Sequence, residues 1–267
     1  MKNVIVIIES LILAASALVL GSLCGNLVID KVHLLPFIED ALANIIPDIM
    51  LILSQIMVLV LNYKKDWKHQ TGLSVKGRIQ DCFSIFFLSG GIVLLSYMIL
   101  ILSKIIFYDG SGFERFGVGT VFIFIVTMFI RMFIVGVSEE LLFRAVIAGE
   151  LVKKYGKIAA VIISTVIFTL FHCMVIQCWT QVTVIFITGM ILGIIFIQTE
   201  NILYPIFLHC GIDFFTNLVG MNEQVGIISI SSFMTEIRIV EYLFGVMSVW
   251  GAAVIVFSCI FRKKSWY

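Results

Sequence analysis

The stretch Val137-Ser138-Glu139-Glu140-Leu141-Leu142-Phe143-Arg144 places two adjacent acids and an arginine near the end of a long apolar run that starts at Thr120. Moving a charged side chain to membrane depth costs from a few to ~15 kcal/mol, depending on the scale. Such a side chain usually faces the interior of a helix bundle or a water-filled cavity. The stretch therefore indicates a membrane helix that carries a pathway or a functional site.

The composition supports a membrane protein. The chain has 267 residues, of which 61% are hydrophobic and 13% are charged, and its mean hydropathy is +1.12. A soluble domain of this length cannot bury so much apolar surface, whereas lipid removes that problem. The net charge of +1 gives no basic field, so nucleic acid is not an expected partner. The six cysteines include no Cys-x-x-Cys, and a disulfide framework is not expected.

Apolar segments near the ~20 residues that a bilayer needs recur along the whole chain. We predict an all-α, polytopic membrane helical bundle of about eight transmembrane helices. The expected spans are 4–29, 41–63, 83–107, 120–144, 158–176, 182–198, 202–219 and 239–261. The helix that carries the two acids is expected to continue to Tyr155 and to stop at Gly156. The segments 108–119 and 220–238 are expected to be loops.

The chain divides into three predicted parts. Residues 1–120 hold about three spans and a basic cytoplasmic loop, residues 121–220 form the core with the charged motif, and residues 221–267 form a loop and the last span. Lysine and arginine concentrate in cytoplasmic segments of membrane proteins. If the N-terminus is cytoplasmic, most lysine and arginine residues fall in cytoplasmic segments, namely Lys2, those in 64–78, Lys153, Lys154, Lys157 and those in 262–264. Both termini are therefore predicted to be cytoplasmic.

Glu140 and Arg144 are four residues apart, so they share a helix face and can form an ion pair. Glu139 then points in a different direction and is free to act. A carboxylate in an apolar, partly wet cavity can serve as a general base. The alternative is a purely structural ion pair.

Two later helices repeat the four-residue spacing with histidine. Phe168 and His172 share a face of the fifth span, and His209 and Asp213 share a face of the seventh. The second pair could donate metal ligands, or it could form a hydrogen-bonded pair that stabilises an oxyanion. The alternative for each histidine is a packing role in the helix bundle.

Together these side chains supply a general base, imidazoles and a polarising site, which are the parts needed to drive water onto an amide. The chain has no Gly-x-Ser-x-Gly and no His-Glu-x-x-His, so neither a serine mechanism nor a zincin motif is supported. Transport is a rival interpretation, because acids and histidines in a bundle also form proton relays.

The three motifs in this order resemble the CPBP family, which comprises CAAX proteases and bacteriocin-processing enzymes and is also called the Abi family. Its pattern is Glu-Glu-x-x-x-Arg, then Phe-x-x-x-His, then His-x-x-x-Asn/Asp on successive membrane helices. The corresponding stretches here run from Glu139 to Arg144, from Phe168 to His172 and from His209 to Asp213. The resemblance covers about 130–219.

The resemblance implies an intramembrane endopeptidase, a hydrolase that cleaves peptide bonds within the bilayer. By analogy Glu139 would activate the attacking water with help from His172, while His209 and Asp213 would bind the oxyanion. Glu140 and Arg144 would brace the site, and Phe168 would support it. Family members are commonly called metalloproteases, which suggests a divalent metal such as zinc. Its ligands would be Glu139, His172, His209 and Asp213, although the glutamate–water scheme needs no metal.

Asp213 departs from the prenyl-protein enzymes of the family, which have asparagine there. Asparagine can donate a hydrogen bond to an oxyanion, whereas an ionised aspartate can only accept one. Asp213 is therefore expected to be protonated, to orient His209 or to bind a cation.

The resemblance implies a substrate that is a lipidated CAAX-type protein cleaved near its C-terminus, or a small membrane-active peptide, presented in lipid. In a bacterial plasma membrane, bacteriocin maturation or self-immunity would fit, and the bundle would supply a cavity open to cytosol and lipid. The alternative is a non-proteolytic immunity or scaffold protein, or a small transporter.

The depth of the two motifs poses a geometric condition. Glu139 lies near the cytoplasmic end of its predicted span, whereas His172 lies ~20 Å along the helix from Ile158. They can meet only if the fifth helix starts well outside the hydrocarbon, or if the glutamate motif lies deeper than the predicted boundary.

Overall fold

The computed structural model describes residues 2–31, 33–73, 79–174, 176–221 and 224–260, with side chains up to residue 254 in the last segment. The basic residues predicted at 76–78 and 262–264 lie outside the described residues. The elements follow in the order α1 (Lys2–Ile29), α2 (Pro36–Tyr63), η1 (Lys64–Asp66), α3 (Trp67–Gln70), α4 (Ile79–Leu102), β1 (Phe107–Ser111), α5 (Gly112–Phe116), α6 (Val118–Glu140), η2 (Leu141–Ala148), α7 (Gly149–Phe171), α8 (Trp179–Thr199), α9 (Leu203–Asn217), β2 (Val219–Met221), β3 (Ile228–Ser231) and α10 (Glu236–Ile260).

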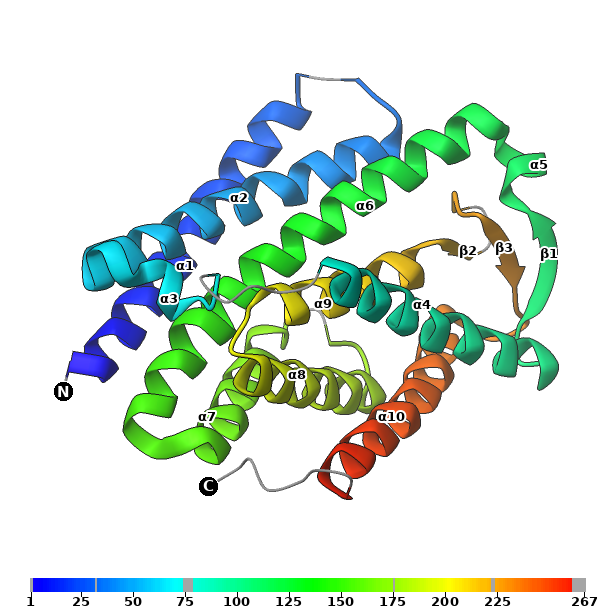
Figure 1. The fold of residues 1–267 in the computed structure, drawn as a ribbon. Coiled ribbons are helices and arrows are strands. Elements are labelled where there is room, and N and C mark those ends of the chain that lie inside the picture. Colours follow the sequence, from blue (N-terminus) through cyan, green and yellow to red (C-terminus); the bar gives the residue numbers. More distant parts are fainter. Residues whose placement is uncertain (1, 32, 74–78, 175, 222–223, 261–267) are drawn as a thin grey trace.

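The prediction of an all-α membrane bundle is confirmed (Figure 1). Six helical stretches of the described chain are long and apolar enough to cross a membrane. One of them, Val118–Phe171, has 54 residues and contains the predicted fourth span and most of the fifth, which was expected to run to residue 176. The predicted seventh span is shorter than expected, because α9 has only 15 residues, or ~22 Å of helix.

Gly156 reverses the chain between those two spans. Its φ of 81° and ψ of 173° interrupt α7, and the positive φ suits glycine because it has no Cβ. Figure 1 shows the reversal at the lower left. Glu139 lies sixteen positions before Tyr155, and His172 lies fifteen positions after Lys157, so the two legs of this hairpin are nearly equal. The glutamate motif is thus deeper than its predicted boundary, and the geometric condition on depth is met.

The first leg contains a π-helix that the sequence did not indicate. η2 follows Glu140 directly, and the amide of Gly149 donates to the carbonyl of Arg144, five residues back. All eight residues of η2 are buried. Such wide turns are rare and occur frequently at functional sites.

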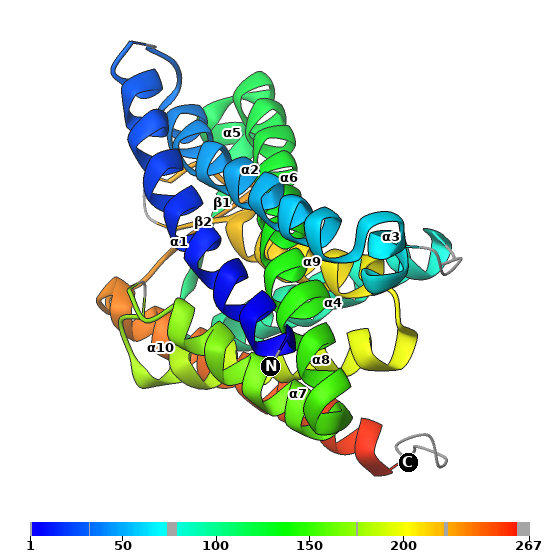
Figure 2. The same cartoon turned by 90° about the vertical axis from the view of Figure 1, so that its left-hand side faces the viewer.

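The first two helices run side by side, as both Figure 1 and Figure 2 show. A Cβ on Gly21 would lie 2.3 Å from the Cα of Pro47, and one on Gly25 would lie 2.8 Å from the carbonyl oxygen of Ala43. Glycine at these two positions therefore permits the close approach of the two helices.

The two predicted loops contain regular structure, which corrects the sequence interpretation. β1 and β3 pair antiparallel, and β2 and β3 pair parallel, giving the order β1-β3-β2. The strands are short, and β1 lies more than 100 residues before β2 and β3 in the chain, so no local alternation marks the sheet. The sheet and α5 close one end of the bundle (Figure 1).

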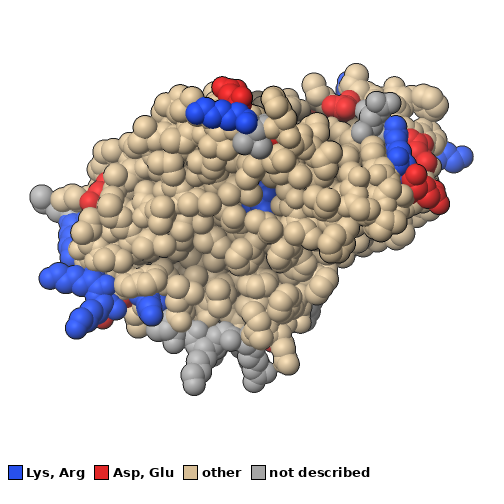
Figure 3. Space-filling view, turned by 90° about the horizontal axis from the view of Figure 1, so that it is seen from above, with Lys and Arg blue, Asp and Glu red and all other residues tan. Residues whose placement is uncertain are grey.

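Buried side chains join the three predicted parts of the chain. One apolar cluster combines Val93 of α4 with Val184 of α8 and Ile239 of α10. The face of the molecule seen in Figure 3 is mostly uncharged. Lysines 64, 65, 68, 153, 154 and 157 are exposed at the end with α3 and the Gly156 bend. That end, the lysine-rich end, lies opposite the sheet (Figure 1).

Candidate active site

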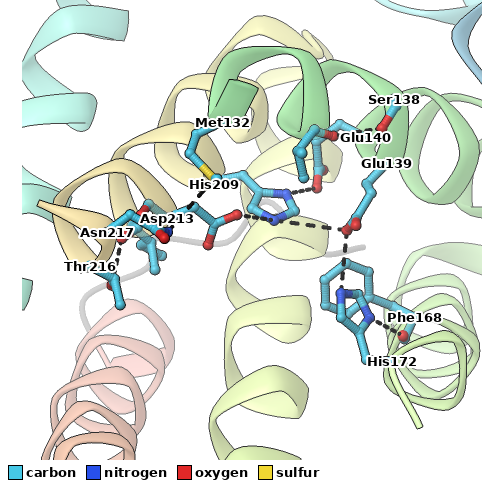
Figure 4. A network of polar contacts seen from close by, with 12 residues as sticks. Met132, Ser138, Glu139, Glu140, Phe168, His172, His209, Asp213, Thr216 and Asn217 are labelled. Atoms are coloured by element: carbon cyan, nitrogen blue, oxygen red, sulfur yellow. Dashed lines mark hydrogen bonds and ion pairs between the residues drawn. The ribbon is translucent and has the colours of Figure 1, made fainter. Parts of the chain in front are cut away.

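All five predicted catalytic side chains meet between three helices (Figure 4). Glu139 and Glu140 come from the end of α6, His172 follows the last residue of α7, and α9 supplies His209 and Asp213. Four of them, all but Glu140, line a cavity of about 620 Å³. The cavity therefore brings together residues that are up to 74 positions apart in the chain.

Glu139 points into this cavity. Its Oε2 lies 3.6 Å from Nε2 of His172 and 3.8 Å from Nε2 of His209. That oxygen is buried and has no hydrogen-bond partner among the described residues, although the side chain as a whole is 20% exposed. A buried acceptor with no protein partner is suited to bind water or a substrate group.

Glu140 is fully buried in a pair of strong contacts. Its Oε1 accepts from Nη1 of Arg144 at 2.8 Å and from Nδ1 of His209 at 2.9 Å. Arg144 also donates through Nη2 to the carbonyl of Gly189 at 3.1 Å and lies 4.6 Å above the ring of Phe168. These contacts link α6, α8 and α9 and fix the orientation of the His209 imidazole.

His172 is held by the end of its own helix. Its amide hydrogen-bonds to the carbonyl of Thr169, so the last turn tightens and the carbonyl of Phe168 is left for another donor. Nδ1 of His172 lies 2.8 Å from that carbonyl oxygen. The ring also packs against the Phe168 ring, with centroids 4.5 Å apart. Phe168 thus contacts both His172 and Arg144.

Asp213 faces His209 from the next turn of α9. Oδ2 lies 3.4 Å from Nε2 of His209, and the Asp213 side chain is 31% exposed. This geometry favours the interpretation in which Asp213 orients His209 or balances its charge.

Two charged residues of the cavity were missed by the sequence reasoning. Asp48 of α2 and Arg131 of α6 both line it, and Asp48 Oδ1 lies 2.9 Å from Oγ of Ser138, the residue before Glu139. Arg131 forms an ion pair with Asp40. A charge inside each apolar run was the available signal, but the direction of each side chain depends on how α2 packs against α6.

The side chains predicted to bind a metal ion are those of the candidate active site. Oxygen and imidazole nitrogen atoms of Glu139, His172, His209 and Asp213 are ligand types that zinc accepts. Within the described residues, however, no group of three or more histidine, cysteine, aspartate or glutamate side chains is arranged to hold an ion. In this arrangement the four side chains do not fit a metal ion, and a divalent metal at the site stays one of the two alternatives that the resemblance leaves open.

Comparison with known families agrees with the resemblance seen in the motifs. Residues 121–215 match the family described as type II CAAX prenyl endopeptidase, Rce1-like. That segment is therefore similar to the CAAX protease family. The matched residues include all three motifs of the CAAX protease family, from Glu139 to Asp213. No curated protein matches the chain.

The family that matches this segment is one of endopeptidases. The apolar helices are those of an integral membrane protein. The match thus supports an intramembrane endopeptidase of the CAAX type.

Proposed function

We propose that the cavity hydrolyses a peptide bond in a lipidated protein or in a small membrane-active peptide, by means of a water molecule activated by Glu139 and His172. The observation that carries this proposal is the position of Glu139 Oε2, which lies 3.6 Å from His172 Nε2 inside the cavity. The description of the matched family adds prenylated proteins as a substrate class.

The hydrogen bonds of His172 assign its protons. The Phe168 carbonyl can only accept, so Nδ1 carries the hydrogen and Nε2 of the neutral ring is an acceptor. Glu139 Oε2 is an acceptor as well. Two acceptors 3.6 Å apart do not bond directly, but one water can donate to both. That water is polarised by two bases, as a nucleophile for amide hydrolysis requires.

His209 is suited to donate a hydrogen bond to the substrate, whereas Glu139 and His172 accept one from water. Glu140 accepts from its Nδ1, while Asp213 and Glu139 both present acceptor oxygens to its Nε2. Three carboxylates around one ring favour the imidazolium form, in which Nε2 is a donor. A donor aimed at the cavity stabilises the oxyanion that forms when water attacks the carbonyl. Asp213 in this scheme supports the charge of His209.

These groups account for each proton that moves in the proposed hydrolysis. Water adds to the carbonyl carbon, its proton passes to Glu139 or His172, and the oxyanion accepts from His209. The carbon–nitrogen bond then breaks, and the same proton is delivered to the leaving amine. Glu140 and Arg144 take no proton in this scheme and hold His209 in place.

The closed end of the cavity supports an enzyme over a transporter. η2 and the apolar cluster around it fill the bundle between Glu140 and the lysine-rich end. In the other direction, a second cavity shares Arg131 and Asn217 with the first and reaches the sheet. A transporter needs a polar path on both sides of its site, whereas a hydrolase needs only one entrance.

This direction bears on the substrate. The lysine-rich end is predicted to be cytoplasmic, and the cavity reaches the opposite end, so the predicted orientation and a cavity open to the cytosol cannot both hold. An outward cavity would suit a secreted membrane-active peptide, as in bacteriocin maturation or self-immunity. An inward cavity would suit a prenylated intracellular protein.

Cysteine labelling separates these two substrates. Asp109 lies on β1 at the sheet end and is exposed, and Lys154 is exposed at the lysine-rich end. In a cysteine-free background we expect a membrane-impermeant maleimide to label Asp109→Cys in intact cells and to label Lys154→Cys only after permeabilisation. The reverse pattern would assign the cavity to the cytoplasmic side.

The activity itself is tested with purified protein in lipid and a library of fluorogenic lipidated peptides. We expect Glu139→Gln and His172→Ala to lower kcat/KM by about 10²–10⁴-fold, the usual contribution of a general base. Glu241→Gln and His69→Ala, which change residues outside the cavity, are matched controls. Cleavage by folded Glu139→Gln at the wild-type rate would refute the proposal.

A further inference from the structure

The lysine-rich end carries six lysines and few acids. Lysines 64, 65 and 68 lie where α2 passes into α3, and lysines 153, 154 and 157 lie around the Gly156 bend. Segments 64–70 and 149–157 hold these six lysines and two acids, Asp66 and Glu150, a formal net charge of +4. Segments 107–116 and 228–241 at the sheet end hold four acids and two arginines, a formal net charge of −2. The two ends of the bundle therefore differ in the sign of their charge.

Buried contacts hold the two lysine segments side by side. The Glu150 side chain is only 4% exposed, and its Oε1 accepts from the hydroxyl of Tyr63 and from Nζ of Lys153, the latter at 2.6 Å. Nζ of Lys153 also lies 4.4 Å from the ring centre of Tyr63. Gln70 donates to the carbonyl of Ala145 at 3.3 Å. These contacts fix the end of α2 and α3 against η2 and the start of α7, so lysines from both segments share one surface.

Most of these lysines have no anionic partner in the protein. Of the six, only Lys153 forms an ion pair with a carboxylate within the described residues. Nζ of Lys154 lies 4.7 Å from the ring centre of Tyr155, and Nζ of Lys68 lies 5.9 Å from that of Trp67. Five exposed ammonium groups on one surface are therefore free to bind an anion.

The side chains next to the lysines indicate that the anion belongs to a lipid. Leu61 in the last turn of α2 and Ile158 just after the bend are each 63% exposed. Both lie in stretches that are long and apolar enough to cross a membrane. Tryptophan and tyrosine, here Trp67 and Tyr155, are enriched at the level of the headgroups. A phospholipid at this end would place its phosphate among the lysines and its acyl chains along the exposed apolar side chains, whereas a soluble anion would use the charge alone.

We propose that the lysine-rich end binds the headgroup of an anionic phospholipid, such as phosphatidylglycerol, between segments 64–68 and 153–157. Each lysine near an anionic lipid surface strengthens binding by about fivefold. The site is separate from the candidate active site, because none of the six lysines lines either cavity. Bound lipid would hold the Gly156 bend at the surface of an anionic leaflet. The cytoplasmic leaflet carries the anionic lipids, in agreement with the predicted cytoplasmic location of this end.

Native mass spectrometry of the purified protein in detergent tests this site, because it resolves the protein with and without one bound lipid. The probes are phosphatidylglycerol, phosphatidylcholine with the same acyl chains, and glycerol 3-phosphate as a soluble phosphate. We expect phosphatidylglycerol to bind at least about tenfold more tightly than phosphatidylcholine, because two or more lysines contact the anionic headgroup. Glycerol 3-phosphate should bind at least about tenfold more weakly than phosphatidylglycerol, because it has no acyl chains to bury.

Two double variants separate the site from the net charge of the protein. Lys154→Gln/Lys157→Gln removes two lysines of the site and keeps the contact between Lys153 and Glu150. Lys31→Gln/Lys104→Gln removes the same charge from exposed lysines that follow α1 and precede β1. We expect the first variant to lose at least about fivefold in affinity for phosphatidylglycerol with phosphatidylcholine binding unchanged, and the second to bind as wild type does. Equal melting temperatures of the two variants show that both are folded.

Equal affinity for the two lipids, or an equal loss of phosphatidylglycerol binding in the two double variants, would overturn the proposal. Binding of glycerol 3-phosphate or of an acidic peptide as tightly as phosphatidylglycerol would also overturn it, because the exposed apolar side chains would then contribute nothing. The measurement needs no peptide cleavage, so its outcome is independent of the proposed function.

Discussion

Replacing Arg144 by methionine isolates the buried ion pair under the candidate active site. The change removes the donor to Glu140 Oε1 and the contact with the Gly189 carbonyl, while Glu140 stays fully buried. Removing one partner of a buried pair costs about 3–5 kcal/mol in a medium of low dielectric, and here the carboxylates of Glu139, Glu140 and Asp213 would be left with the imidazolium of His209 as their nearest counter-charge. We expect Arg144→Met to lower the free energy of unfolding by this amount.

A second substitution separates the charge from the packing. In Glu140→Gln/Arg144→Met the amide oxygen of residue 140 can still accept from His209 Nδ1, and no charge is stranded. We expect the double variant to recover about 2 kcal/mol relative to Arg144→Met, which a double-mutant cycle would measure as coupling. Arg238→Met is the control, because its side chain is 68% exposed in a surface pair with Glu241, and it should cost less than about 0.5 kcal/mol.

The free energy of unfolding can be measured by denaturant titration in mixed detergent micelles. The reasoning is refuted if Arg144→Met costs less than about 1 kcal/mol, or if the double variant is no more stable than the single one. Either result would mean that water or a moved side chain compensates Glu140 in the absence of the arginine.

Three further predictions follow from the packing and the site. Gly21→Val should destabilise the protein by about 1–3 kcal/mol, because its side chain would overlap Pro47, while Gly91→Ala, which meets no atom within 4 Å, should be neutral in the same melting assay. Asp213→Asn should keep kcat/KM within about tenfold of wild type, because an amide oxygen still accepts a hydrogen bond from His209. A loss of kcat/KM in Asp213→Asn that exceeds the loss in Asp213→Ala would contradict this prediction. o-Phenanthroline should leave cleavage unchanged if water activation needs only Glu139 and an imidazole; a loss that zinc reverses would establish the metal.

Much of the helical framework could be predicted because each span carries its own signal. The apolar runs predicted the helices, and Gly156 predicted the end of the fourth span. Both signals are local, because each depends only on residues that are close together in the sequence. The three motifs predicted that the side chains of Glu139, His172 and His209 meet in one site. Their spacing within each helix is also local.

The missed features depend on contacts between distant segments. Asp48 and Arg131 face the cavity only because α2 lies against α6, and nothing within either helix specifies that direction. β1 and β3 are four or five residues long and pair across more than 100 residues. Residues 141–148 are apolar apart from Arg144, as in an ordinary α-helical span, so the sequence does not mark the π-helix. α9 ends two residues before β2 begins, which the apolar run through Val219 did not indicate.

The hairpin around Gly156 has a consequence for changes in chain length. Inserting one residue between Glu139 and Gly156 would shift the carboxylate by 1.5 Å and turn it by about 100° relative to His172. An insertion in the connection between β1 and α6 would leave both where they are. The alignment of Glu139 with His172 therefore depends on the 33 positions between them, with a glycine near the middle. We expect the number of residues in this interval to be fixed even where the apolar side chains along it are exchanged.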